Sequence, residues 1–191
     1  MTALSAKREA VHGRACPLCG ARVSVSAVLH EVLCLMASGA SNAQIGGGRG
    51  EARGGYLVRR VLACLGASRR AHAVDLACRL GLVDMPAEVR PPYQGIPPHL
   101  RASAVLLASG LSYREAAERQ GRSPSAVRAD RHLLYGRLGA SGGAHAVYLL
   151  HALQKLPAGH PCVCLKSPGR NSPEKQWCPP PRRVHGGDAG R

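Results

Sequence analysis

Apolar residues recur at the three- and four-residue spacing of amphipathic helices in two segments of this chain, residues 28–83 and 99–155. In the second segment the stretches HLRASAVLLASG and YREAAERQ, and a third that begins at Pro124, each predict a short helix. In the third stretch Val127, Leu134 and Leu138 fall on one stripe, which should face the core. The pattern therefore predicts an all-α protein.

Residues that start and end helices divide the second segment further. They are Gly110, Ser112, Glu115, Gly121, Ser123, Pro124 and Gly139. Ser112 and Glu115 have the spacing of a capping box, and Ser123 before Pro124 is typical of a helix N-terminus. The third helix should then run to Leu138. Two helices joined by so short a glycine turn predict a helix-turn-helix.

Three short landmarks occur twice in the same order, and they indicate a tandem repeat. They are ASG at 37–39 and 108–110, LGAS at 65–68 and 138–141, and AHAV at 71–74 and 144–147. The predicted organisation is an N-terminal segment (1–27), a first repeat (28–83), a proline-rich linker (84–98), a second repeat (99–155) and a tail (156–191) rich in Pro, Gly and Arg. The tail should be largely disordered because it has little to bury.

The first repeat is the less regular copy. The stretch GGGRGEARGG, residues 46–55, stands where the turn and the start of the third helix should lie, and it has no Ser-Pro cap. Each glycine inside a helix costs about 1 kcal/mol relative to alanine. We therefore expect the first repeat to fold but to contact bases poorly, and to serve for packing or phosphate contact.

The sequence LASGLSYREAAERQGRSPSAVRADRHLLYGRLGASGGAHAVYLL is similar to the LuxR/GerE-type DNA-binding domain, over residues 100–153. Region 4 of sigma factors shares its three central helices. The resemblance implies two tandem four-helix domains, the first degenerate, in a bacterial transcriptional regulator that binds double-stranded DNA. It also implies a homodimer formed through the fourth helix.

The outward face of the third helix carries the candidate base contacts. They are Ser125, Arg128, Ala129 and His132. Ser123 and the free amides at the helix start can hold a phosphate, and Arg114, Arg119 and Arg122 can contact the flanking backbone. Arg131 departs from the family pattern, which has an aliphatic residue there, so either its stem reaches out to solvent or the helix is rotated.

Charge supports a nucleic-acid partner. The formal net charge is +15, and it comes almost wholly from arginine, since only four lysines occur.

No apolar run is long enough to span a membrane and the N-terminus lacks a signal sequence, so a cytoplasmic location is expected. The chain also contains no recognisable catalytic motif, and we expect it not to be an enzyme.

The cysteines suggest one structural zinc ion. Cys16 and Cys19, in CPLCG, have the spacing of a zinc knuckle. His30 and Cys34 complete the set most locally; the alternative completion is Cys162 and Cys164, with Cys178. Cys64 and Cys78 lie on apolar helix faces and should pack in the core. A second functional hypothesis follows: a non-enzymatic adaptor whose degenerate repeats and zinc knuckle contact other proteins.

Overall fold

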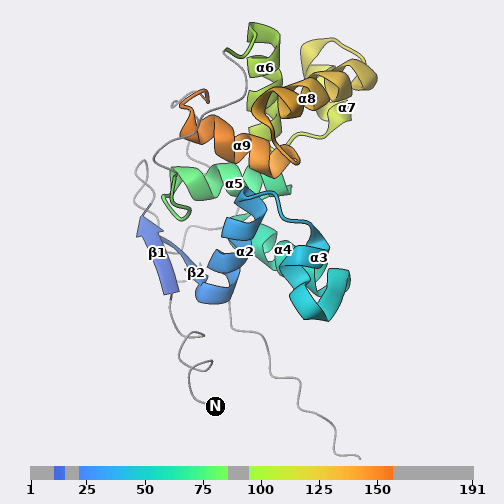
Figure 1. Cartoon of the computed structure of the whole chain (residues 1–191). Helices are drawn as coiled ribbons and strands as arrows, with labels where there is room; N and C mark the ends of the chain where they lie inside the picture. Colours follow the sequence, from blue (N-terminus) through green and yellow to red (C-terminus); the bar gives the residue numbers. More distant parts are fainter. Residues whose placement is uncertain (1–10, 16–21, 86–94, 157–191) are drawn as a thin grey trace, which may run out of the picture.

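The computed structural model describes residues 11–15, 22–85 and 95–156, and Figure 1 shows their order in space. The N-terminal part comprises the strands β1 (Val11–Ala15) and β2 (Arg22–Ser26), then α2 (Ala27–Ala37), α3 (Asn42–Gly46), the 3-10 helix η1 (Gly47–Arg49), α4 (Gly50–Leu65) and α5 (Arg70–Arg79). The second repeat comprises α6 (Pro98–Ala108), α7 (Tyr113–Gln120), α8 (Pro124–Leu138) and α9 (Gly143–Ala152). The described chain is mostly helical, as predicted. The antiparallel pair β1–β2, in which Val11 lies opposite Ser26, was not predicted.

Local capping explains where α7 and α8 start, and it confirms the starts expected for these two helices. The Ser112 hydroxyl accepts from the Glu115 amide at 3.2 Å, and the Glu115 carboxylate accepts from the Ser112 amide at 2.7 Å. Ser123 caps α8 by accepting from the amide of Ala126 at 3.2 Å. Because these bonds satisfy amides that have no partner within the helix, each helix starts at its serine.

The glycine-rich stretch of the first repeat forms helix rather than interrupting it. η1 and the first turns of α4 occupy these residues, and α4 continues without a break to Leu65. Gly54 explains part of this, because a Cβ there would lie 1.8 Å from the backbone oxygen of Asn42. Glycine at this position lets α4 pack directly on the start of α3.

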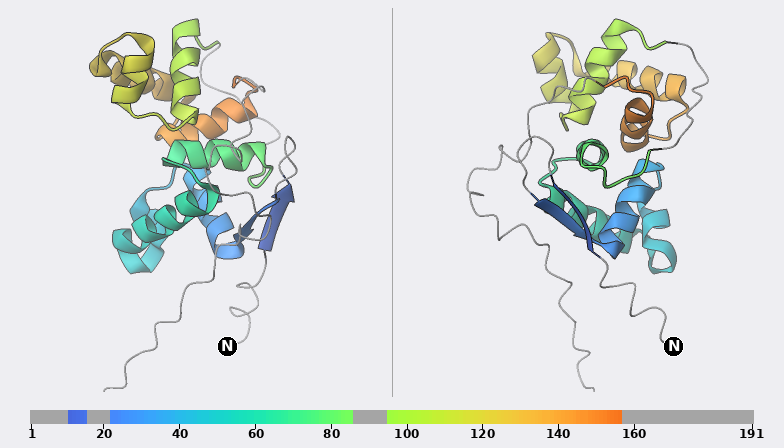
Figure 2. Two further views of the ribbon diagram at one scale, coloured as in Figure 1. Left: turned by 180° about the vertical axis from the view of Figure 1, so that it is seen from behind. Right: turned by 90° about the vertical axis from the view of Figure 1, so that its left-hand side faces the viewer.

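The two repeats pack on each other through their last helices. Figures 1 and 2 show α5 and α9 stacked at the centre of the molecule, with α2–α4 on one side and α6–α8 on the other. Each last helix also contacts the first helix of the other repeat, α5 with α6 and α9 with α2. Leu107, Ala108 and Val147 of the second repeat belong to the same buried cluster as Met36 and Val74 of the first. The hydrophobic core therefore crosses between the repeats.

Equivalent polar contacts occur on both sides of the packing of α5 on α9. We call this interface between the repeats, together with its Ser68–Gly110 and Ser141–Gly39 contacts, the joint. The Ser68 hydroxyl donates to the Gly110 oxygen at 3.2 Å, and the Ser141 hydroxyl donates to the Gly39 oxygen at 3.2 Å. A contact in which the same two positions exchange roles is the hallmark of a two-fold symmetric interface. The joint is therefore an approximate two-fold interface within one chain.

The two glycines of the joint have no room for a side chain. A Cβ on Gly39 would lie 1.9 Å from the Ser141 hydroxyl oxygen, and one on Gly110 would lie 2.3 Å from that of Ser68. Both glycines also have positive φ angles, +87° and +78°, which other residues rarely adopt. Glycine at these positions is required by the joint as well as by the helix ends.

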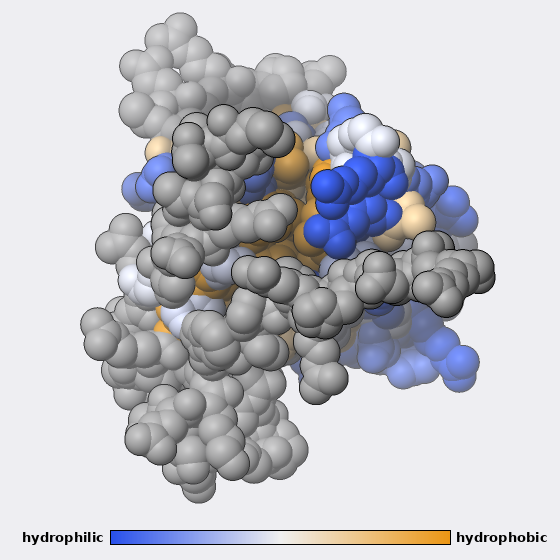
Figure 3. Space-filling model, turned by 90° about the horizontal axis from the view of Figure 1, so that it is seen from below, coloured by the Kyte–Doolittle hydropathy of each residue, from blue (hydrophilic) through white to orange (hydrophobic). Residues whose placement is uncertain are grey.

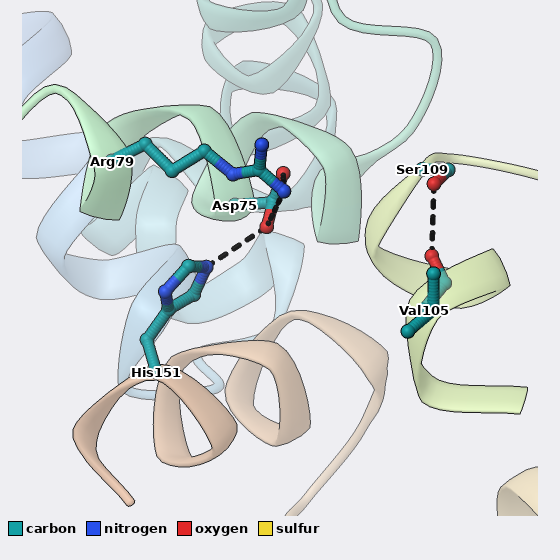
Figure 4. Close-up of polar contacts among 5 residues, drawn as sticks. All are labelled: Asp75, Arg79, Val105, Ser109 and His151. Atoms are coloured by element: carbon teal, nitrogen blue, oxygen red, sulfur yellow. Dashed lines mark hydrogen bonds and ion pairs between the residues drawn. The ribbon is translucent and has the colours of Figure 1, made fainter. Parts of the chain in front are cut away.

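A buried carboxylate breaks the symmetry of the joint. Asp75 on α5 is only 2% exposed, and Figure 4 shows Arg79 and His151 converging on it. The Arg79 guanidinium lies 3.0 Å from one carboxylate oxygen, and the Nε2 of His151, from α9, lies 2.8 Å from the other. His151 is thus a polar link between the two repeats.

Replacement of His151 by alanine should destabilise the whole chain, because the buried Asp75 carboxylate would lose its partner from the other repeat. We expect the free energy of unfolding in urea to fall by about 1 to 3 kcal/mol. Lys155→Ala, an exposed change just beyond α9, is the control and should change it by less than about 0.5 kcal/mol. Equal effects of the two substitutions would contradict this role of His151.

Acid should weaken the joint through His145. The Nδ1 atom of His145 accepts from the Ser141 amide at 3.2 Å, which requires an unprotonated nitrogen, and burial lowers the pKa of this imidazole. The unfolded chain then binds more protons than the folded chain once the pH falls below about 6.5. This contribution to stability is full above that pH and is lost as the pH falls through the folded-state pKa.

Urea unfolding of the wild type and of His145→Gln at pH 7.5 and pH 5 measures the effect. Glutamine can accept the same hydrogen bond but does not titrate, so the variant should lose less stability between the two pH values. Identical losses would show that His145 does not contribute to the pH dependence.

Candidate nucleic-acid interface

Helices α7 and α8 follow one another across the short glycine turn that the sequence predicted, and their assignment as a helix-turn-helix stays a prediction. Gly121 ends α7 in the left-handed conformation, and the chain turns within two residues to the N-cap Ser123. The predicted inward stripe is confirmed, since Val127, Leu134 and Leu138 are all buried. Ala116 and Ala117 pack against Val127, so the two helices share a small core of their own.

The predicted contact residues on α8 all lie on its open face. Ser125, Arg128, Ala129 and His132 are exposed. Leu133, which was not among the predicted residues, is 49% exposed and follows Ala129 by one helical turn. Its position four residues after Ala129 was the available signal. The outward face thus combines one free-standing guanidinium with two apolar side chains and an imidazole.

Arg131 neither reaches out to solvent nor marks a rotated helix, so both expected outcomes are wrong. The residue is 4% exposed; its Nη2 donates to the Leu111 backbone oxygen at 3.0 Å, and its guanidinium lies 4.8 Å from the ring centre of Tyr113. Burial lowers the pKa of this guanidinium, although arginine stays charged at neutral pH. Arg131 therefore ties α8 to the segment that leads into α7.

Two of the three arginines expected to contact phosphate are paired with carboxylates. Arg122 forms an ion pair with Asp130, which raises the pKa of Arg122, first through the hydrogen bond and then through the charge. Arg114 pairs with Glu118 at 3.1 Å on the surface of α7. Arg119 is exposed on the same helix. The Arg122 pair joins the turn to α8, so its first role is structural.

Ser123 is also engaged in the fold. In addition to capping α8, its hydroxyl lies 3.0 Å from the hydroxyl of Ser125. The side chain that was expected to hold a phosphate is therefore used by the helix start. Ser125 is exposed beside it and shares its hydrogen bond.

The first repeat presents a comparable helix on the same side of the molecule. In Figure 1 and in the reverse view of Figure 2, α3–α4 and α7–α8 lie at one side, separated by the stacked α5 and α9. Tyr56 of α4 is 39% exposed, with the Arg53 guanidinium 5.4 Å from its ring centre, and Arg59 and Arg49 are exposed. Figure 3, seen from below, shows hydrophilic side chains at the end formed by α3 and α4.

The residues expected to bind zinc lie only partly within the described chain. The Nε2 of His30 lies 2.7 Å from the backbone oxygen of Leu82, and Cys34 is half-buried, which raises its thiol pKa. Cys16 and Cys19 lie outside the described residues, as do Cys162, Cys164 and Cys178 of the alternative set. In the described ranges, no three His, Cys, Asp or Glu side chains are grouped to hold a metal ion. The zinc site stays a prediction.

The remaining described cysteines pack near the core. Cys64 donates to the backbone oxygen of Ser24 at 3.7 Å. Burial and the nearby Asp75 carboxylate raise the pKa of Cys78 to about 12, so its thiol is protonated at neutral pH. Both packing roles agree with the prediction for these residues.

Comparison with protein-family models, curated proteins and solved structures gave no match for this chain. The likeness to the LuxR/GerE-type domain therefore rests on the residues themselves. Within the described ranges, every helix is too short or too polar to cross a bilayer.

Loss of the Arg131 side chain should destabilise the packing of α8 on the segment that leads into α7. In Arg131→Ala the Leu111 oxygen loses a donor and Tyr113 loses its stacked guanidinium, and we expect a cost of about 1 to 3 kcal/mol in urea unfolding. Arg119→Ala removes the same side chain from an exposed site of α7 and should change stability by less than about 0.5 kcal/mol. Similar losses in both variants would refute the tying role of Arg131.

Proposed function

We propose that this chain is a cytoplasmic, non-enzymatic DNA-binding transcriptional regulator that inserts α8 into the major groove of double-stranded DNA. The observation that carries the proposal is the exposed face of α8. Arg128 and Ala129 are exposed, and so is His132, whose ring makes an edge contact with Tyr135, on a helix whose opposite side is fixed by Val127 and Leu134. A rigid helix with a polar outward face is what base recognition requires.

The exposed residues of α8 named above can each contact a group that the bases present in the major groove of DNA. Arg128 can donate two hydrogen bonds to O6 and N7 of a guanine. Ala129 and Leu133 supply apolar contact for the methyl group of thymine, and His132 and Ser125 can hydrogen-bond to base edges. Arg119, which is exposed on α7, can contact a phosphate, and this contact would fix the register of the helix without selecting sequence.

Charge provides the general attraction. The net charge of +15 gives a chain that approaches any polyanion, and its affinity should fall steeply with salt. Arg114 and Arg122 contribute less to this than expected from the sequence, because carboxylates of the same chain already face them. Specificity would then come from a few residues of α8 rather than from the arginines as a group.

A protein-binding adaptor is the competing proposal, and the exposure of Leu133 favours it. A large apolar side chain on an outward helix face is also what a protein partner would cover. Selection of bound duplexes from a random DNA pool by the purified chain distinguishes the two functions. A regulator enriches one recurring motif, whereas an adaptor retains DNA without sequence preference and releases it in salt.

Arg128→Ala should lower affinity for the enriched site by about 1 to 3 kcal/mol and reduce the ratio of specific to unspecific binding. Arg119→Ala, the matched control on α7, should weaken all DNA about equally and lower the salt slope by about one. Fluorescence anisotropy titrations at several salt concentrations measure both. A harmless Arg128→Ala, or an altered sequence preference in Arg119→Ala, would overturn this assignment of α8.

A further inference from the structure

Helices α4 and α8, the third helix of each repeat, are related by the approximate two-fold axis of the joint. The joint pairs Ser68 with Gly110 and Ser141 with Gly39 at the same distance, 3.2 Å, and places α4 and α8 on one side of the molecule. A two-fold pair of helix-turn-helix units contacts two half-sites about one helical turn of DNA apart. In most proteins two chains provide that pair, whereas here both units belong to a single chain.

We propose that one copy of this chain is a complete, asymmetric DNA reader, with α8 in one major groove and α4 in the next. The proposal rests on the proposed function and adds its target: a duplex site of two unlike halves, bound by one chain. Homodimerisation through the last helix is then unnecessary, because α5 and α9 cover each other inside the chain.

The unlike halves follow from the residues of α4. The two helices can be aligned on the left-handed glycines that end them, Gly66 for α4 and Gly139 for α8. In this alignment Tyr56 and Arg59 of α4 correspond to Ala129 and His132 of α8. The position of Arg128 is held by Gly55, so α4 lacks the side chain expected to contact guanine in the other half. Because the outward residues of the two helices differ, we expect the two helices to prefer different bases.

The chemistry of α4 nevertheless suits DNA. Arg59 is exposed on α4 and Arg49 is exposed at the end of the preceding η1, and the Arg53 guanidinium is held 5.4 Å from the ring centre of Tyr56. The tyrosine ring offers an apolar edge for a thymine methyl group, and Arg59 can contact a guanine or a phosphate. Each would act from a continuous helix that Gly54 holds against α3.

The steric fit of the joint argues that the pair stays within one chain. Gly39 and Gly110 leave no space for a Cβ, and Leu107, Ala108 and Val147 are buried in the core of the first repeat. Separating the repeats would expose this apolar surface to water. The spacing of α4 and α8 should therefore be fixed before DNA is bound.

The test uses the purified full-length chain, a pool of random duplex DNA and native mass spectrometry of the complex with the enriched site. We expect a motif of two unlike halves about 10 base pairs apart, bound by one chain per duplex. The double variant Tyr56→Ala and Arg59→Ala should lose roughly 5- to 150-fold in affinity when the α4 half is intact, and much less when that half is scrambled. Arg128→Ala should show the reverse dependence, and Lys155→Ala, outside both helices, should bind like the wild type.

Three results would overturn the inference while leaving the proposed function intact. They are a palindromic motif bound by two chains, a single half-site as the whole motif, and a double variant whose loss does not depend on the α4 half. Circular dichroism and urea unfolding of the variants exclude loss of folding as the cause. Absence of any enriched DNA motif would instead overturn the proposed function, and the inference with it.

Discussion

Two glycines let the repeats meet, and the rest of the arrangement depends on that contact. At Gly39 and Gly110 the backbone of one repeat approaches a serine hydroxyl of the other so closely that a Cβ would overlap it. The approach brings α5 against α9 and places Leu107 and Val147 in the core of the first repeat. Because packing falls off steeply with separation, a side chain at either glycine would open the whole contact.

The joint also decides where the outward helices lie. α4 and α8 are the third helices of their repeats, and each is braced on the last helix of its own repeat. Fixing α5 against α9 therefore fixes the separation of α4 and α8. Within the second repeat, Arg131 and the Arg122–Asp130 pair hold α8 on its inward side and leave Arg128 and His132 exposed. Of the arginines on α8 and in the turn before it, Arg131 and Arg122 therefore have partners within the fold, whereas Arg128 is left exposed.

The helices of the second repeat could be predicted from sequence because their signals are local. Ser112 with Glu115, and Ser123 with Pro124, act over three or four residues, and the inward stripe of α8 has a simple period. The burial of the Arg131 side chain could not be predicted in this way, because its partners Leu111 and Tyr113 come close to it only after folding. The glycine-rich stretch misled for a similar reason, since the cost of glycine in α4 is offset by its close contact with α3.

The packing of the two repeats on each other at the joint could not be predicted from the sequence. The repeated LGAS and AHAV motifs were visible, and they contain the serines and histidines of the contact, but nothing local indicates that Ser68 meets Gly110. The stretch RVSVS of β2 does alternate, but it is only five residues long, and VHGRA of β1 has no such alternation. The residues of the candidate DNA interface were placed on an exposed face by helical geometry alone, and their role in binding stays a prediction.

Native-state amide hydrogen exchange of the full chain tests the central claim, that the two repeats are one unit held at the joint. If the claim is correct, amides in α5 and α9 are the most protected, and both helices exchange with the same free energy, that of global unfolding. If α9 instead opens with the second repeat at a lower free energy while α5 stays protected, the repeats are separate units and the account is wrong.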